Sequence, residues 1–175
     1  DACLWAIAAC SFWGLMRFGE STVKSRSAFD PNKHLTRARA HFKTDALGAE
    51  YLRLDLPSAK TAKPGEVQHV FLVPQSSLCP LAAVRNLMTV MPALDDDPLF
   101  CWRDLKTGAI RPMTRSAALR SINERLATSS SGRAFGHSFR IGGASHYLAK
   151  GTPPDVVQMM GCWRSLAYQV YVRSF

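Results

Sequence analysis

The stretch AEYLRLDL, residues 49–56, alternates strictly between apolar and polar side chains. Successive side chains of a β-strand point to opposite faces, so Leu52, Leu54 and Leu56 would share one face of an extended strand. Such a strand needs a hydrophobic core on one side and water on the other, which is typical of an antiparallel sheet.

Two other segments are expected to pair with this strand. VQHVFLVP, residues 67–74, predicts a strand that ends at its proline, and the turn sequence SAKTAKPGE separates it from the first strand. LTRARAHF, residues 35–42, alternates more weakly and also predicts a strand. Together these segments predict a small three-stranded antiparallel sheet.

The remaining sequence has helical patterns. Pro80 fits the first turn of a helix, Thr114 fits an N-cap position, and Gly151 fits the position just after a helix end. The expected helices cover residues 1–19, 80–91, 114–129, 137–150, 153–161 and 165–175. The predicted fold class is therefore α+β, mostly helical with one small sheet.

The charge balance indicates a polyanionic partner. The chain has 175 residues, enough for one domain, and 22 Lys and Arg residues against 13 Asp and Glu residues give a net charge of +9. Nucleic acid is the first expectation and an acidic membrane surface the second, while a basic surface kept for solubility is the alternative. The apolar opening, residues 2–16, is short for a membrane span, and it predicts a buried helix.

No cofactor or metal is expected. The five cysteines are scattered, without a CxxC pair or a Cys/His cluster, so neither a disulfide framework nor a zinc site is indicated. This cysteine usage fits a reducing interior compartment. The acidic run DDD, residues 95–97, lies in a loop before Pro98, and a solvated turn is expected there rather than a two-metal site.

Five short motifs place basic and aromatic residues where secondary structure turns. GLMRFGE contains an arginine three residues before Glu20, GHSFRIGGAS contains His-x-x-Arg, and SAKTAKPG, GCWRS and AYQVYVR contribute a lysine, a tryptophan and a tyrosine. Each motif alone has an ordinary interpretation: an ion pair with Glu20, a surface lysine, a solvated helix face or core packing. The small residues GGAS would let their helix pack closely against a neighbour.

In this order, the motifs resemble the catalytic boxes of the tyrosine recombinases, the phage integrase family. The first box and the Gly-x-Trp motif are most similar to versions from eukaryotic, especially fungal, mobile elements. The resemblance extends over residues 1–175 as a catalytic domain. The N-terminal core-binding domain with which such enzymes clamp DNA is expected to be absent from this sequence.

The resemblance implies DNA strand cleavage and rejoining through a 3′-phosphotyrosyl intermediate, without metal or ATP. Paired arginine forks would offset the charge that builds on the phosphate oxygens during transfer. The lysine would act as general acid, and the tyrosine would act as nucleophile. The implied catalytic residues are Arg17, Lys60, His137, Arg140, Trp163 and Tyr171.

Several alternatives stay open at this point. Lys63 lies in the same turn as Lys60, and Tyr168 lies three residues before Tyr171. The alternative functions are a type IB topoisomerase-like nicking and closing activity, or an inactive DNA-binding module. The expected partners are double-stranded DNA and further copies of the protein in a tetrameric synapse, with no membrane. The expected location is the nucleus in a eukaryote and the cytoplasm otherwise.

Overall fold

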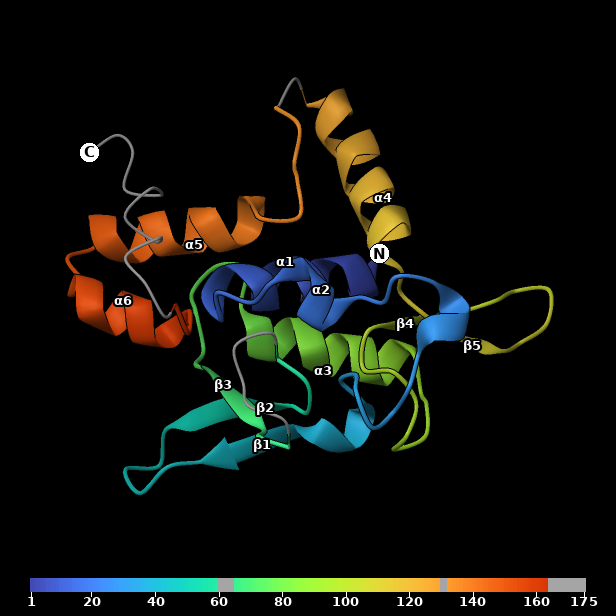
Figure 1. Cartoon of the computed structure of the whole chain (residues 1–175), viewed down its shortest axis with the longest axis horizontal. Helices are drawn as coiled ribbons and strands as arrows, with labels where there is room; N and C mark the ends of the chain where they lie inside the picture. The colour runs from blue at the N-terminus through green and yellow to red at the C-terminus, as the bar shows by residue number, and fades with distance from the viewer. Residues whose placement is uncertain (60–64, 130–131, 164–175) are drawn as a thin grey trace.

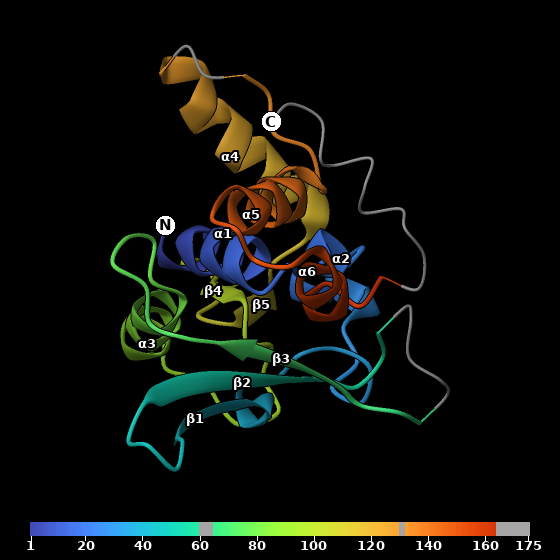
Figure 2. The same cartoon turned by 90° about the vertical axis from the view of Figure 1, so that its left-hand side faces the viewer.

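The computed structural model describes residues 1–59, 65–129 and 132–163. Helix α1 (Ala2–Trp13) lies at the centre and packs against α5 (Ser138–Ala149) on one side and α3 (Pro80–Val90) on another (Figures 1 and 2). Most residues of α1 are buried, as the apolar opening of the sequence predicts. The core therefore forms around the first helix of the chain.

The sheet has the predicted three antiparallel strands, with β2 in the middle. Its strands are β1 (Ala40–Thr44), β2 (Glu50–Leu56) and β3 (Gln68–Leu72). Leu52, Leu54 and Leu56 are all buried, which confirms the face predicted from the alternation. The α+β class and the three-stranded sheet are thus confirmed.

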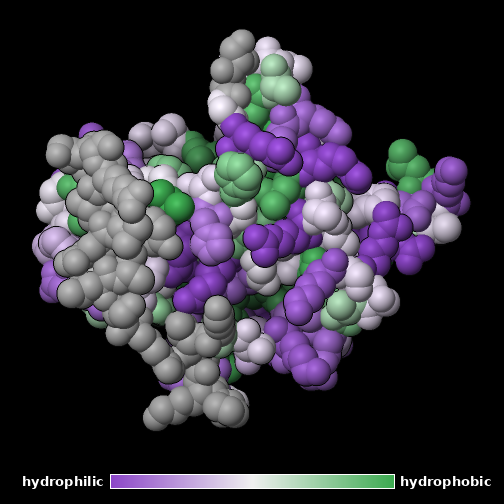
Figure 3. Space-filling view, turned by 45° about the horizontal axis from the view of Figure 1, so that its top comes forward, coloured by the Kyte–Doolittle hydropathy of each residue, from purple (hydrophilic) through white to green (hydrophobic). Residues whose placement is uncertain are grey.

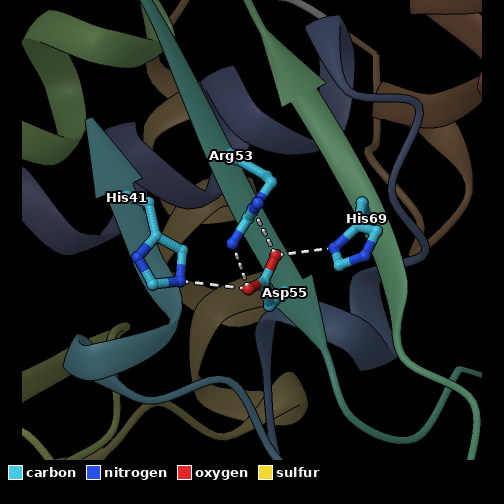
Figure 4. A network of polar contacts seen from close by, with 4 residues as sticks. All are labelled: His41, Arg53, Asp55 and His69. Carbon is cyan, nitrogen blue, oxygen red and sulfur yellow. Dashed lines mark hydrogen bonds and ion pairs between the residues drawn. The ribbon is translucent and has the colours of Figure 1, made fainter. Parts of the chain in front are cut away.

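The polar face of this sheet carries a network centred on one carboxylate (Figure 4). Asp55 on β2 lies 3.0 Å from Nε2 of His41 on β1 and 2.7 Å from Nδ1 of His69 on β3. The guanidinium of Arg53 donates to the same carboxylate at 3.0 Å. One side chain therefore links all three strands.

Two expected boundaries are wrong. The first helix ends at Trp13 rather than near residue 19, because the chain turns at Gly14 and Leu15, and Leu15 has a left-handed φ of 48°. The segment 35–42 is a strand only from Ala40 onward. Before it, the side chain of Arg37 is buried and donates to the carbonyl of Met91 at 2.9 Å, and this segment forms a 3-10 turn. A long-range contact thus overrides the weak local alternation.

The helices after the sheet largely follow the prediction. Pro80 begins α3, and Thr114 caps α4 (Arg115–Thr128) by accepting from the backbone N–H of Ala117 at 3.3 Å. Helix α4 projects from the body of the molecule (Figure 1). The other helices are α2 (Phe18–Ser21) and α6 (Pro154–Met160). The helix expected over residues 165–175 lies outside the described residues.

A second sheet was not expected. It pairs β4 (Cys101–Arg103) with β5 (Ile110–Pro112) in antiparallel fashion. Strands of three residues are too short for a period of two to stand out in a sequence. The bridge between Val23 and Thr114 then connects this region to the start of α4.

Candidate active site

The turn after α1 places the first arginine. A Cβ atom on Gly14 would lie 2.7 Å from Cγ1 of Val70 and 3.0 Å from Cδ2 of Leu72, so β3 packs directly against the backbone there. The chain reverses at Leu15 and enters α2 with Arg17 at the N-cap. Arg17 therefore lies outside the first helix, although the helix expected over residues 1–19 included it.

Glu20 fixes the side chain of Arg17. Oε1 of Glu20 accepts from Nη1 of Arg17 at 2.9 Å, and Oε2 accepts from the backbone N–H of Arg17 at 2.7 Å. The Arg17 side chain is 22% exposed, and the Glu20 side chain is 8% exposed. The simple interpretation that Glu20 is the partner of Arg17 is confirmed. The guanidinium is nevertheless held in place with part of its surface accessible.

Hydrogen bonds fix the segment that leads to His137. The side-chain amide of Asn123 on α4 donates to the carbonyl of Ala134 at 2.9 Å and accepts from its N–H at 2.8 Å. Phe135 then donates its backbone N–H to the hydroxyl of Ser138 at 2.8 Å. His137 occupies the N-cap position of α5, without a capping bond from its side chain, and is exposed. The approach to α5 is thus fixed, and His137 itself is accessible to solvent.

Arg17 and His137 line the same cavity, of about 300 Å³. Ser58, Arg115 and Gly136 complete the lining together with residues 18–20. Among the described residues that line the cavity, Glu20 is the only acidic one, and both of its oxygens are bonded to Arg17. The cavity is therefore positively charged overall and suits an anionic group. In Figure 3, hydrophilic residues gather over the centre and the right of the visible face, and apolar residues form smaller separate patches among them.

Arg140 lies in a different environment from His137. It is 4% exposed, and its Nη1 and Nη2 each donate at 2.5 Å, to the carbonyls of Leu15 and Gly161 respectively. Its guanidinium lies 4.1 Å from the centre of the Trp163 ring, a distance typical of a cation–π contact. Because Leu15 is two residues before Arg17, Arg140 stabilises the backbone that carries the first arginine. Contact between Arg140 and a phosphate stays a prediction.

Trp163 lies beside Arg140, and the neighbouring Cys162 lies within reach of the charges of both Arg140 and Arg17. The Trp163 ring packs against Gly161, and its carbonyl accepts from the side chain of Gln158 at 3.1 Å. Burial raises the pKa of the Cys162 thiol and the charge of Glu20 raises it further, while the positive charges of Arg140 and Arg17 lower it; the net shift is upward. The Gly-x-Trp segment is therefore within the electrostatic range of both arginines.

The close packing predicted for GGAS is confirmed. A Cβ atom on Gly143 would lie 2.0 Å from the carbonyl oxygen of Phe12, so α1 and α5 touch backbone to backbone at this point. His146 packs against the rings of Phe12 and Trp13 on the same interface. The helix behind His137 and Arg140 is thereby seated on the central helix.

Two predicted catalytic residues, Lys60 and Tyr171, lie outside the described residues, as do their alternatives Lys63 and Tyr168. Ser58, which lines the cavity, is two residues before Lys60 in the chain. Trp163 is the last described residue, eight positions before Tyr171. The structure thus brings Arg17 and His137 into one cavity and places Arg140 and Trp163 together nearby.

Sequence reasoning missed Arg115. It is the first residue of α4, is exposed, and lines the cavity with Arg17 and His137. The positive end of the helix dipole lies at the N-terminus, so an arginine is electrostatically unfavourable there. A basic residue immediately after an N-cap threonine is the sequence signal that could have identified it.

All five cysteines are free. Within residues 1–59, 65–129 and 132–163, no group of three or more His, Cys, Asp or Glu side chains could hold a metal ion. The run DDD forms a turn, in which Asp97 accepts from the backbone N–H of Leu94 at 2.8 Å. In the same described part of the chain, no helix is long and apolar enough to cross a membrane.

The chain is similar to known proteins in its fold rather than in its sequence. No family model and no curated protein sequence matches the chain. An FLP recombinase–Holliday junction complex superposes with a TM-score of 0.56 at 12% identity, covering 94% of this chain and 39% of that one. A complex of mutant Flpe with a DNA Holliday junction gives a TM-score of 0.59 at 11% identity, covering 98% and 40%. The chain spans about two fifths of the length of these recombinase chains. It therefore has the fold of the matching part of FLP recombinase, as its resemblance to the tyrosine recombinases implies.

Proposed function

We propose that this chain is the catalytic part of a DNA recombinase that cuts and rejoins strands through a covalent tyrosine link. The observation that carries the proposal is the joint position of Arg17 and His137 in one positively charged cavity. The fold supports it, because the superposed structures are recombinases in complex with DNA Holliday junctions. The net charge of +9 fits a DNA partner.

The cavity residues suit phosphoryl transfer. A phosphodiester is anionic, and additional charge builds on its non-bridging oxygens during transfer. Arg17, held by Glu20, offers a preorganised guanidinium to those oxygens, and preorganised donors usually contribute more than any other effect to such catalysis. Arg140 and Trp163 complete the proposed site from the buried side. No metal is needed in this scheme, since the arginines supply the positive charge.

Tyr171 is the proposed nucleophile. Its hydroxyl oxygen attacks phosphorus and forms the phosphotyrosyl bond, while the bond from phosphorus to the 5′ oxygen breaks. His137 assists removal of the tyrosine proton, and Lys60 gives a proton to the departing 5′ oxygen. The new link retains the energy of the phosphodiester, so a 5′-hydroxyl of DNA reverses the step without ATP.

A suicide DNA substrate tests the proposal. When the substrate is nicked near the cleavage site, the short released strand diffuses away and the protein–DNA adduct accumulates. We expect an adduct with the unmodified protein and with Tyr168→Phe, and none with Tyr171→Phe. Loss of the adduct in Tyr168→Phe alone would move the nucleophile to that residue, and the absence of an adduct on any DNA would support an inactive DNA-binding module.

Strand exchange separates the two enzymatic candidates. A recombinase joins strands from two duplexes, whereas a type IB topoisomerase-like enzyme reseals the same duplex after it relaxes. We expect exchanged products from two differently labelled duplexes, with four copies of the protein assembled on them. Adducts and relaxation of supercoiled DNA without exchanged products would favour the topoisomerase-like activity.

Arg17→Ala tests the cavity itself. We expect the rate of adduct formation at saturating DNA to fall by about 10²–10³, the usual cost of losing one preorganised donor at a developing negative charge. Arg17→Lys should restore only part of the rate, because an ammonium lacks the planar fork. An unchanged rate in Arg17→Ala would remove this residue from the proposed site.

A further inference from the structure

We propose that Arg115 binds a phosphate of the DNA backbone next to the phosphate held by Arg17, and so sets the position of the DNA in the cavity. This inference rests on the proposed function and adds a DNA-binding residue to it. Arg115 is absent from the set of six residues that the sequence resemblance implies. Its place in the cavity is visible only in the tertiary structure.

The guanidinium of Arg115 is directed toward the cavity by its contact with Gly136. A Cβ atom on Gly136 would lie 2.5 Å from Nη2 of Arg115 and 3.1 Å from both Cζ and Nε. The guanidinium therefore lies directly over the backbone of the residue that precedes His137. A larger residue at position 136 would displace it.

The backbone of Arg115 is firmly held. Its N–H donates to the carbonyl of Val23 at 3.0 Å, and the N–H of Val23 donates to the carbonyl of Met113 at 3.0 Å. These bonds attach the start of α4 to the segment that follows α2, which begins at the Arg17 cap. Backbone hydrogen bonds thus connect the residue that carries Arg115 to the segment that begins at Arg17.

The charges around Arg115 favour the binding of an anion. Within the described part of the chain, its guanidinium makes no hydrogen bond or ion pair with an acidic side chain, and the N-terminus of α4 repels it. Glu20, the one acid among the described lining residues, is already bonded twice to Arg17. A phosphate bound between Arg115 and the cavity would offset this concentration of positive charge.

Exposure indicates which phosphate Arg115 binds. Arg17 is partly buried, at 22% exposure of its side chain, whereas Arg115 is an exposed residue of the same cavity. Arg115 therefore lies at the rim, where the DNA backbone enters, and the more enclosed Arg17 holds the phosphate that reacts. Arg115 contributes to binding and register rather than to the chemical step.

The test measures DNA affinity at several salt concentrations for Arg115→Ala and for a control variant, Arg120→Ala. The control removes the same charge from an exposed residue of α4 that does not line the cavity. One phosphate contact contributes about 0.9 to the slope of log affinity against log salt. We expect Arg115→Ala to reduce the slope by about one and the affinity by about tenfold, while Arg120→Ala leaves the slope unchanged. Equal slope changes in the two variants would overturn the proposal, because general charge would then explain both.

Gly136→Ala keeps the charge of Arg115 but displaces its guanidinium. We expect it to weaken DNA binding, with no further loss when it is combined with Arg115→Ala, provided that thermal unfolding shows both proteins folded. Replacing the neighbouring phosphate of the substrate by a neutral methylphosphonate should weaken binding by the unmodified protein but not by Arg115→Ala. Additive losses in either combination would contradict a shared contact.

Two further outcomes distinguish the possible failures. If Arg115→Ala changes affinity for one base-pair substitution rather than uniformly, the residue reads a base and the phosphate proposal is wrong. If no protein–DNA adduct forms at all, the proposed function fails, while the salt slopes and the methylphosphonate still test Arg115 as a phosphate ligand. When adducts do form, Arg115→Ala should raise the DNA concentration that gives half of the maximal adduct rate, whereas Arg17→Ala should lower the maximal rate itself.

Discussion

Replacing Gly143 by alanine should separate α5 from α1 and loosen the candidate site. The new Cβ atom would lie 2.0 Å from the carbonyl oxygen of Phe12, and ordinary contact begins at 3.4 Å. The two helices would have to separate by about 1.4 Å, because a tightly packed backbone has no free space to absorb the methyl group. The substitution therefore acts on the position of the whole helix.

This movement has a calculable effect on Arg140. Its 2.5 Å hydrogen bond to Leu15 crosses the same interface, and an additional 1.4 Å would lengthen it to about 3.9 Å, beyond hydrogen-bonding range. Overpacking costs about 1–3 kcal/mol, and a hydrogen bond from a charged group contributes about 1.5–3 kcal/mol. Alanine is more favourable than glycine inside a helix by about 1 kcal/mol, which offsets part of this loss. We expect a net loss of about 1.5–5 kcal/mol in the free energy of unfolding.

The neighbouring glycine supplies the control. A Cβ atom on Gly142 would lie 3.4 Å and 3.7 Å from ring carbons of Phe12, which is ordinary contact. Gly142→Ala should therefore be neutral or stabilise the protein by up to about 1 kcal/mol. Urea unfolding measures both variants, and DNA adduct formation should fall only in Gly143→Ala. Equal unfolding midpoints for the two variants would refute the close-contact argument.

Three further predictions concern stability and reactivity. Burial raises the pKa of Asp55, but hydrogen bonds and charges from His69 and a neighbouring arginine outweigh it and lower the pKa overall. Asp55→Asn should thus reduce the free energy of unfolding at neutral pH. The difference in this free energy between the variant and the unmodified protein should shrink as pH falls below about 4. A difference that does not change with pH would contradict this. Thr114→Ala should cost about 1 kcal/mol in urea unfolding through loss of the α4 cap, whereas no loss would mean that the cap contributes nothing. Burial raises the pKa of the Cys79 thiol, yet backbone N–H donors lower it overall, while burial raises the pKa of Cys10. Brief treatment with iodoacetamide should alkylate Cys79 well before Cys10 by mass spectrometry, and equal labelling would contradict the assigned environments.

Local sequence patterns were enough to predict much of the fold. The alternation of β2 identified its buried face, and Thr114 identified the start of α4, because both depend on residues a few positions apart. The motifs also identified Arg17 and His137, which the structure brings into one cavity. The proposed roles of the six motif residues stay predictions, and two of them lie outside the described residues.

Long-range packing decided the rest. Helix α1 ends early because β3 packs directly against Gly14, and no local pattern encodes that contact. Arg140 is buried against the carbonyl of Leu15, a residue distant in sequence, whereas the ordinary interpretation of its His-x-x-Arg motif is a solvated helix face.

The sequence by itself determined the α+β class, the three-stranded sheet and the residue types suited to phosphate chemistry. Only the tertiary structure decided which of these residues lie together in one cavity. Helical and strand periodicities report on neighbours within a few residues, whereas the cavity joins the α2 cap, the start of α4 and the approach to α5. Arg115 enters the candidate site for this reason, through a contact with Gly136 that exists only once these segments pack together.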